Sequence, residues 1–129
     1  MDVDYVCALK KIYDSFSVLN FDAVTELLHE DIYWREAIGT DQEASILGLN
    51  EVKKHVLSQL PIFWERFDII PIEFIQANEI VVVTTIYDIK EKLSQKRFST
   101  GAAHIWKFKD NKAIELQTFI NTVSEKINT

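Results

Sequence analysis

Glu36 is the one carboxylate on the apolar face of a short alternating segment. Residues 31–38 alternate in polarity, which predicts a strand that carries on one face Ile32, Trp34, Glu36 and Ile38. A carboxylate on that face is partly removed from water, so its pKa rises and it becomes a useful acid or base near neutral pH. A second interpretation stays open, in which Glu36 lies at the wet end of the strand or pairs with an arginine.

His104 has a similar place in a longer alternating segment, residues 97–109. It shares one face of the predicted strand with the aromatic side chains of Phe98, Trp106 and Phe108. A neutral imidazole there can donate a hydrogen bond to a developing oxyanion or shuttle a proton. The alternative is a histidine that only packs in the core. Convergence of Glu36 and His104 on one pocket would favour the catalytic interpretation for both.

Tyr13 lies on the apolar stripe of the predicted first helix, where its hydroxyl needs a partner. It can bond a ligand or a pocket carboxylate, and simple core packing is the alternative. No two histidines have the spacing of metal ligands, and the sequence contains no phosphate loop, nucleophile elbow or dinucleotide fingerprint. Cys7 is the only cysteine, which excludes an internal disulfide and a cysteine-based zinc site. We expect no metal and no cofactor.

Helical periodicity in the first half of the chain gives way to alternation in the second half. The spacing predicts helices over residues 5–16, 21–29 and 50–60, and it predicts strands over 31–38, 67–76, 80–89, 97–109 and 113–121. Pro71 indicates that its strand lies at an edge or carries a bulge. Three helices followed by a twisted antiparallel sheet make an α+β domain, with the sheet curled around the first helix and a pocket at its open end.

The strand predicted over residues 80–89 is apolar on both faces. Helices can cover one face, and a chain of 129 residues has no spare element for the other. Burial against a second copy of the same sheet is the simplest cover, which predicts a homodimer with Ile105 in the interface. The orientation of Asp88 stays open, because it has the parity of Ile80, Val82, Thr84 and Ile86, but the hairpin near Leu93 is close enough for the strand to be leaving the core.

Composition limits the classes of partner. The chain has 14 Lys and Arg against 20 Asp and Glu, for a net charge of −6, so nucleic acid is an unfavourable partner. No apolar run is long enough to cross a bilayer, and acidic residues stand where a signal peptide needs positive charge. We therefore expect a soluble, cytoplasmic chain with no membrane partner. It should form a single domain over 1–129, with a core from about 5 to 121 and a polar tail over 122–129.

Four segments in a fixed order resemble one known family. A helix that ends before a second short helix is matched by IYDSFSVLNFDA (12–23), and a helix-to-strand passage by LLHEDIYWRE (27–36). A glycine entry into the third helix is matched by ILGLNEV (46–52), and the last hairpin by HIWKFKDNKAI (104–114). From about Tyr5 to Asn121 the chain resembles the nuclear transport factor 2-like superfamily, and within it the SnoaL-like and ketosteroid isomerase-like branch. The resemblance implies a cone-shaped, cystatin-like, mostly antiparallel sheet around three N-terminal helices, with a pocket and usually a dimer.

The resemblance also implies roles for particular positions. The carboxylate that transfers the proton in the isomerase branch falls on Glu36, and the partner acid of the penultimate strand is replaced by His104. The tyrosine that binds the enolate oxygen falls on Ile12, next to Tyr13. The carboxylate that polyketide cyclases carry near the end of the last strand is replaced by Asn121.

Two functions are compatible with these residues. The first is a cofactor-independent isomerase, cyclase or related acid/base enzyme that acts on a small hydrophobic carbonyl compound through Glu36 and His104. The second is a non-catalytic ligand-binding or dimerisation module with the same fold. In either case we expect an apolar pocket with two orienting polar side chains. Its expected lining residues are Tyr13, Trp34, Phe98 and Trp106, with Phe119 added by the resemblance, and its orienting residues are Gln117 and Asn121.

Overall fold

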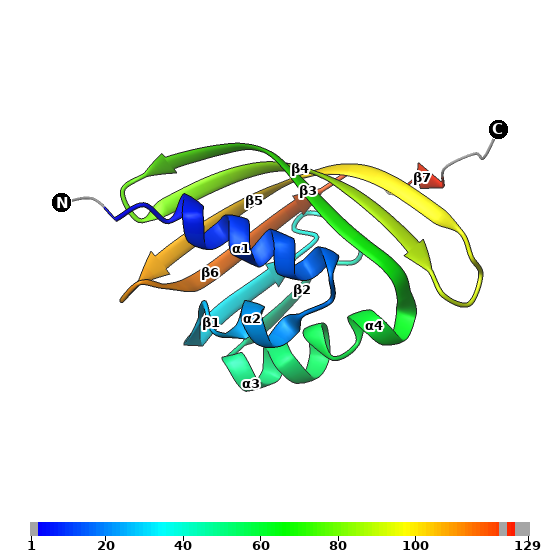
Figure 1. Ribbon diagram of the computed structural model, residues 1–129, viewed down its shortest axis with the longest axis horizontal. Helices are drawn as coiled ribbons and strands as arrows, with labels where there is room; N and C mark the ends of the chain where they lie inside the picture. The colour runs from blue at the N-terminus through cyan, green and yellow to red at the C-terminus, as the bar shows by residue number, and fades with distance from the viewer. Residues whose placement is uncertain (1–2, 122–123, 126–129) are drawn as a thin grey trace.

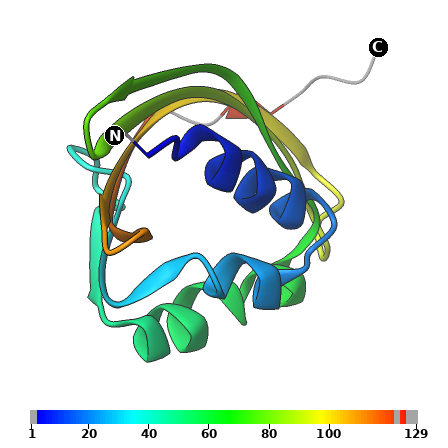
Figure 2. The same ribbon diagram turned by 60° about the vertical axis from the view of Figure 1, so that its left-hand side comes forward.

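A strongly curved sheet wraps around the first helix in the computed structural model, which describes residues 3–121 and 124–125 (Figure 1). The helical elements are α1 (Val6–Ser17), α2 (Phe21–Thr25), α3 (Leu49–Val52), the π-helical turn η1 (Lys53–Leu57) and α4 (Leu60–Phe63). The strands are β1 (Leu28–Glu36), β2 (Ala44–Leu47), β3 (Trp64–Ala77), β4 (Ile80–Glu91), β5 (Arg97–Lys109), β6 (Lys112–Ile120) and β7 (Ser124–Glu125). Figure 2 shows α1 inside the curve, with the short helices on the side of α1 opposite to β3 and β4.

The apolar stripe of α1 faces the interior. Leu9, Ile12, Tyr13 and Phe16 recur at three- and four-residue spacing, and all four side chains are buried. The carboxylate of Asp4 accepts a hydrogen bond of 2.9 Å from the backbone N–H of Val6, which satisfies one of the free donors at the start of the helix. The helix thereby delivers Tyr13 into the hollow of the sheet.

The strands follow the order β2-β1-β6-β5-β4-β3, and β7 pairs with β5. Only β1 and β6 run parallel among the described pairs, and the others are antiparallel. The predicted antiparallel pairing of the last two long strands is confirmed, with His104 opposite Thr118. The prediction of an α+β fold with a mostly antiparallel, curved and unclosed sheet is confirmed as well. β3 lies at one edge and shifts register between Pro71 and Glu73, as expected for a proline without an N–H.

Three local predictions differ from the structure. The helix predicted over 21–29 ends at Thr25, because Leu28 already pairs with β6 opposite Ala113, so His29 lies in a strand. Residues 44–47, for which no helix or strand was predicted, form β2 against β1. The helix predicted over 50–60 ends at Leu57, and Pro61 lies in the first turn of the separate helix α4, where its missing N–H costs nothing.

The two apolar faces of β4 have different surroundings. Val81 and Val83 are fully buried on the inner face, which also carries Tyr87. The outer face belongs to the convex surface of the sheet. Exposed apolar side chains on this surface come from β3, β4 and β6, namely Ile70, Ile72, Ile75, Ile80, Ile86 and Phe119. Asp88 also faces outward, and its carboxylate forms ion pairs with Arg97 at 2.7 Å and Arg66 at 3.2 Å. No helix within residues 3–121 is long and apolar enough to cross a membrane.

Candidate functional site

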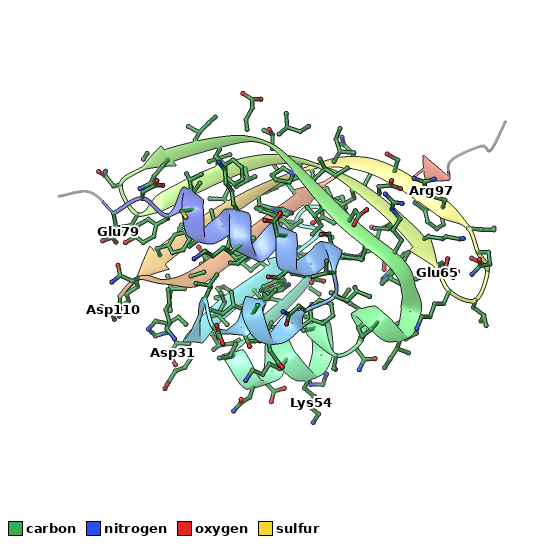
Figure 3. The ribbon with its side chains drawn as sticks, in the orientation of Figure 1. Asp31, Lys54, Glu65, Glu79, Arg97 and Asp110 are labelled. Carbon is green, nitrogen blue, oxygen red and sulfur yellow. The ribbon has the colours of Figure 1, made fainter. Side chains whose placement is uncertain are left out.

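A cavity of about 240 Å³ lies between α1 and the inner face of the sheet. Aromatic and aliphatic side chains from α1, β1, η1, α4 and strands β3 to β6 form most of its wall. Glu36 is the one carboxylate among its lining residues. The labelled charged side chains in Figure 3, such as Lys54, Glu65 and Asp110, lie on the periphery of the molecule instead. The cavity therefore presents a mostly apolar surface with a few convergent polar groups, as binding sites for small molecules do.

His104 stands in the wall of this cavity between two tyrosines. Its Nδ1 lies 2.6 Å from the hydroxyl oxygen of Tyr13, and its Nε2 lies 2.6 Å from the hydroxyl oxygen of Tyr87. The indole N–H of Trp106 donates a third hydrogen bond, of 3.0 Å, to the Tyr13 hydroxyl. We call these four residues the tyrosine–histidine cluster. Every member is buried, and every member lines the cavity.

Burial keeps the tyrosine–histidine cluster uncharged. It lowers the pKa of His104 from 6.5 to about 3, because an imidazolium would lose its hydration without gaining a counter-ion. Burial also raises the pKa of Tyr13 above its ordinary value. The pKa of Tyr87 is raised by burial first, and then by the nearby negative charges that Tyr13 and Glu36 can carry. At neutral pH the cluster therefore consists of one neutral imidazole and two protonated hydroxyls.

Glu36 ends β1 at the wall of the same cavity. The indole N–H of Trp34 donates a hydrogen bond of 2.6 Å to its Oε1, and the side chain is half-buried. The next residue, Ala37, has a φ of 52°, a left-handed conformation that stops the strand. No ion pair of Glu36 occurs within the described part of the chain, so Oε2 stays available to a ligand.

Five of the residues singled out from the sequence meet at this cavity: Tyr13, Trp34, Glu36, His104 and Trp106. Their convergence follows from two local patterns. The α1 stripe turns Tyr13 inward, while strand alternation puts the other four on the inner face of β1 and β5.

The other four expected residues do not line this cavity. Phe98 faces inward at the far end of β5, where its ring packs edge-on against Trp64 with centroids 6.5 Å apart. Gln117 and Phe119 are on the outer face, because the neighbouring Leu116, Thr118 and Ile120 point inward. Gln117 donates to Glu115, and Phe119 is 40% exposed. Asn121 follows β6 and borders a shallow depression shared with Phe119, away from the tyrosine–histidine cluster.

Sequence reasoning missed Tyr87 and Thr118 as lining residues. Tyr87 has the parity of Val81 and Val83, but both faces of that strand are apolar, and alternation alone does not say which one is inside. Thr118 lies opposite His104 on β6, a neighbour that only the strand register reveals. Residues 3–121 contain no group of three or more His, Cys, Asp or Glu side chains that could hold a metal ion.

No protein-family model matches the sequence, and comparison with curated proteins finds no match. Solved structures do match over nearly the whole chain. One is a nuclear transport factor 2-like protein of unknown function from Burkholderia pseudomallei, with 18% identity, a TM-score of 0.78 and coverage of 91% of this chain and 90% of that one. Another is TerC, co-crystallised with polyporic acid, with 22% identity, a TM-score of 0.76 and 91% of each chain covered.

A third similar structure is a candidate polyketide cyclase from Pseudomonas putida. It has 12% identity and a TM-score of 0.77, and the match covers 89% of this chain and 90% of that one. Further matches have ketosteroid isomerase-like and cystatin-like folds. At these identities the likeness establishes the fold: the chain has the nuclear transport factor 2-like fold that its sequence segments resemble.

Proposed function

We propose that this protein binds a small, mostly apolar carbonyl compound in the cavity and moves a proton at the carbon next to the carbonyl. The observation that carries the proposal is the meeting of Glu36 and the tyrosine–histidine cluster at one apolar cavity, with no hydrogen bond between them. A direct Glu36–His104 bond would have left no room for a reacting group. That both line one cavity supports a reacting group held between them.

Glu36 acts as the general base in this reaction. It takes a proton from the carbon next to the carbonyl. The electron pair of the broken C–H bond forms a C=C bond, and the π pair of the carbonyl moves onto its oxygen. The tyrosine–histidine cluster stabilises that oxygen through hydrogen bonding in a site with little water. In a conjugated enone, return of the proton from Glu36 to the far carbon of the dienolate gives an isomerase. Attack of the enolate carbon on a second carbonyl, whose oxygen then takes the proton from Glu36, gives a cyclase.

Similar structures support a small organic ligand. TerC was co-crystallised with polyporic acid, and other matches include candidate polyketide cyclases and an epoxide hydrolase-like protein. A non-catalytic binding protein is the second candidate. It is favoured by the observation that both nitrogens of His104 and one oxygen of Glu36 are already hydrogen-bonded within the protein.

Hydrogen–deuterium exchange separates the two candidates without knowledge of the natural substrate. The probe is 1-indanone, a compact aromatic ketone, and proton NMR in D₂O follows the loss of its hydrogens at the carbon next to the carbonyl. The proposed enzyme accelerates this exchange, and Glu36→Gln slows it by about a hundredfold. Glu30→Gln is the matched control, since Glu30 is exposed on the same strand. Binding without accelerated exchange would favour the non-catalytic protein.

We propose further that two copies associate through the convex surface. The exposed isoleucines of β3 and β4 form an apolar area that a second copy of the same sheet would cover, and Ile105 belongs to the same face. Sedimentation at micromolar concentration tests this, and a monomer would refute it.

A further inference from the structure

The direction of the hydrogen bonds in the tyrosine–histidine cluster determines which group can reach a ligand. A neutral imidazole has one N–H donor and one bare nitrogen that accepts. Both nitrogens of His104 contact tyrosine hydroxyls, so one tyrosine donates to His104 and the other accepts from it. The tyrosine that accepts keeps its own O–H hydrogen free. The cluster therefore has one spare donor, and it belongs to either Tyr13 or Tyr87.

The indole of Trp106 makes the two tyrosines unequal. Its N–H already donates to the Tyr13 oxygen at 3.0 Å. If Nδ1 of His104 also carried a hydrogen, two N–H groups would converge on that oxygen and Tyr13 would hold the spare donor. If Nε2 carries it, every bond runs head to tail: Trp106 to Tyr13, Tyr13 to His104 and His104 to Tyr87. Bonds in such a chain polarise and strengthen one another.

We infer that His104 carries its hydrogen on Nε2 and that Tyr87 donates the hydrogen bond that a ligand receives. The site then selects apolar molecules that carry one acceptor oxygen, with the carbonyl group as the fitting class. Tyr13 and His104 are positioning residues, which hold the Tyr87 hydroxyl and orient its hydrogen. This inference rests on the proposed function, because it names the group that holds the oxygen of the ligand.

The surroundings of Tyr87 agree with this direction. Its hydroxyl has one hydrogen-bond partner, His104, within the part of the chain that the structure describes. Tyr87 is 8% exposed and lines the cavity, so its free hydrogen can be directed toward a ligand in the cavity. A ligand without an acceptor would leave this buried donor unsatisfied, which makes its binding less favourable.

The first test compares 1-indanone with indane, which has the same ring skeleton and no oxygen. We expect wild-type protein to bind 1-indanone about tenfold more tightly than indane, and we expect Tyr87→Phe to remove that preference. The carbonyl stretching frequency of bound 1-indanone should rise in Tyr87→Phe, because its hydrogen bond is lost. Tyr33→Phe is the matched control, since Tyr33 lies on the outer face of β1 and should leave both affinities unchanged.

The second test needs no ligand. Nitrogen-15 NMR of the wild-type protein distinguishes the two ring nitrogens of His104, and we expect Nε2 to carry the hydrogen. A hydrogen on Nδ1, or a preference for 1-indanone that is lost in Tyr13→Phe and kept in Tyr87→Phe, would overturn the inference. Equal affinity for both probes would refute only the role of Tyr87 as the hydrogen-bond donor to the ligand. If neither probe binds, the proposed function fails together with the ligand role of Tyr87.

Discussion

The uncharged state of His104 should make the stability of the protein depend on pH in a defined way. Burial lowers the pKa of this imidazole from 6.5 to about 3 in the folded protein. The unfolded chain therefore binds a proton at His104 at a higher pH than the folded protein does. Because stability rises with pH wherever the unfolded state binds more protons, the contribution is complete above pH 6.5 and is lost as the pH falls towards 3.

The size of the effect follows from the pKa difference. One pKa unit corresponds to about 1.4 kcal/mol, so the loss is about 4 kcal/mol at pH 3 and about 5 kcal/mol well below it. At pH 5 the loss is about 2 kcal/mol, which urea denaturation measures without acid unfolding of the whole chain. Many carboxylates titrate over the same range, so wild-type protein alone does not isolate His104.

The assay therefore compares wild type with His104→Gln, a variant that cannot be protonated. The difference in free energy of unfolding between the two proteins should shrink by about 2 kcal/mol between pH 7.5 and pH 5. The His55→Gln control replaces an exposed histidine, whose side chain is 53% exposed, and tests whether the loss of any histidine reproduces the effect. A wild-type to His104→Gln difference that is constant across this range would refute the buried, neutral imidazole. Chemical shifts of a protonated His104 ring above pH 5, measured by NMR, would refute it as well.

Three further predictions concern the base and the convex surface. Glu36→Gln should slow deuterium exchange of 1-indanone by about a hundredfold at unchanged fold, as measured by NMR and circular dichroism. Trp34→Phe removes the 2.6 Å hydrogen bond that orients Glu36, so exchange should slow by about tenfold, and an unchanged rate would show that this bond does not position the base. Ile86→Lys places a charge on the convex surface and should yield a monomer in sedimentation. Leu93→Lys, at a side chain that is 97% exposed in the β4–β5 turn, should not.

Local sequence patterns determined most of the long elements and the inward direction of several site residues. Alternation around Glu36 and His104, and the three-to-four spacing around Tyr13, are properties of a few neighbouring residues. An apolar face in this part of the chain favours burial whichever strand lies beside it. The polar residue that interrupts such a face is therefore carried inward with its neighbours, and its position can be predicted without knowledge of the fold.

Tertiary structure decided which of two apolar faces is inside and which distant residues meet. The inner face of β4, and with it Tyr87, is selected by pairing with β5, which sets Val83 opposite His104. The cluster joins Tyr13 to a histidine 91 positions later in the chain. The same dependence on pairing placed Phe119 outside, because β6 joins β5 with Phe119 opposite Ala103 on the outer face. Strand register and sheet curvature depend on the whole sheet, so a pattern read over a few residues does not contain them.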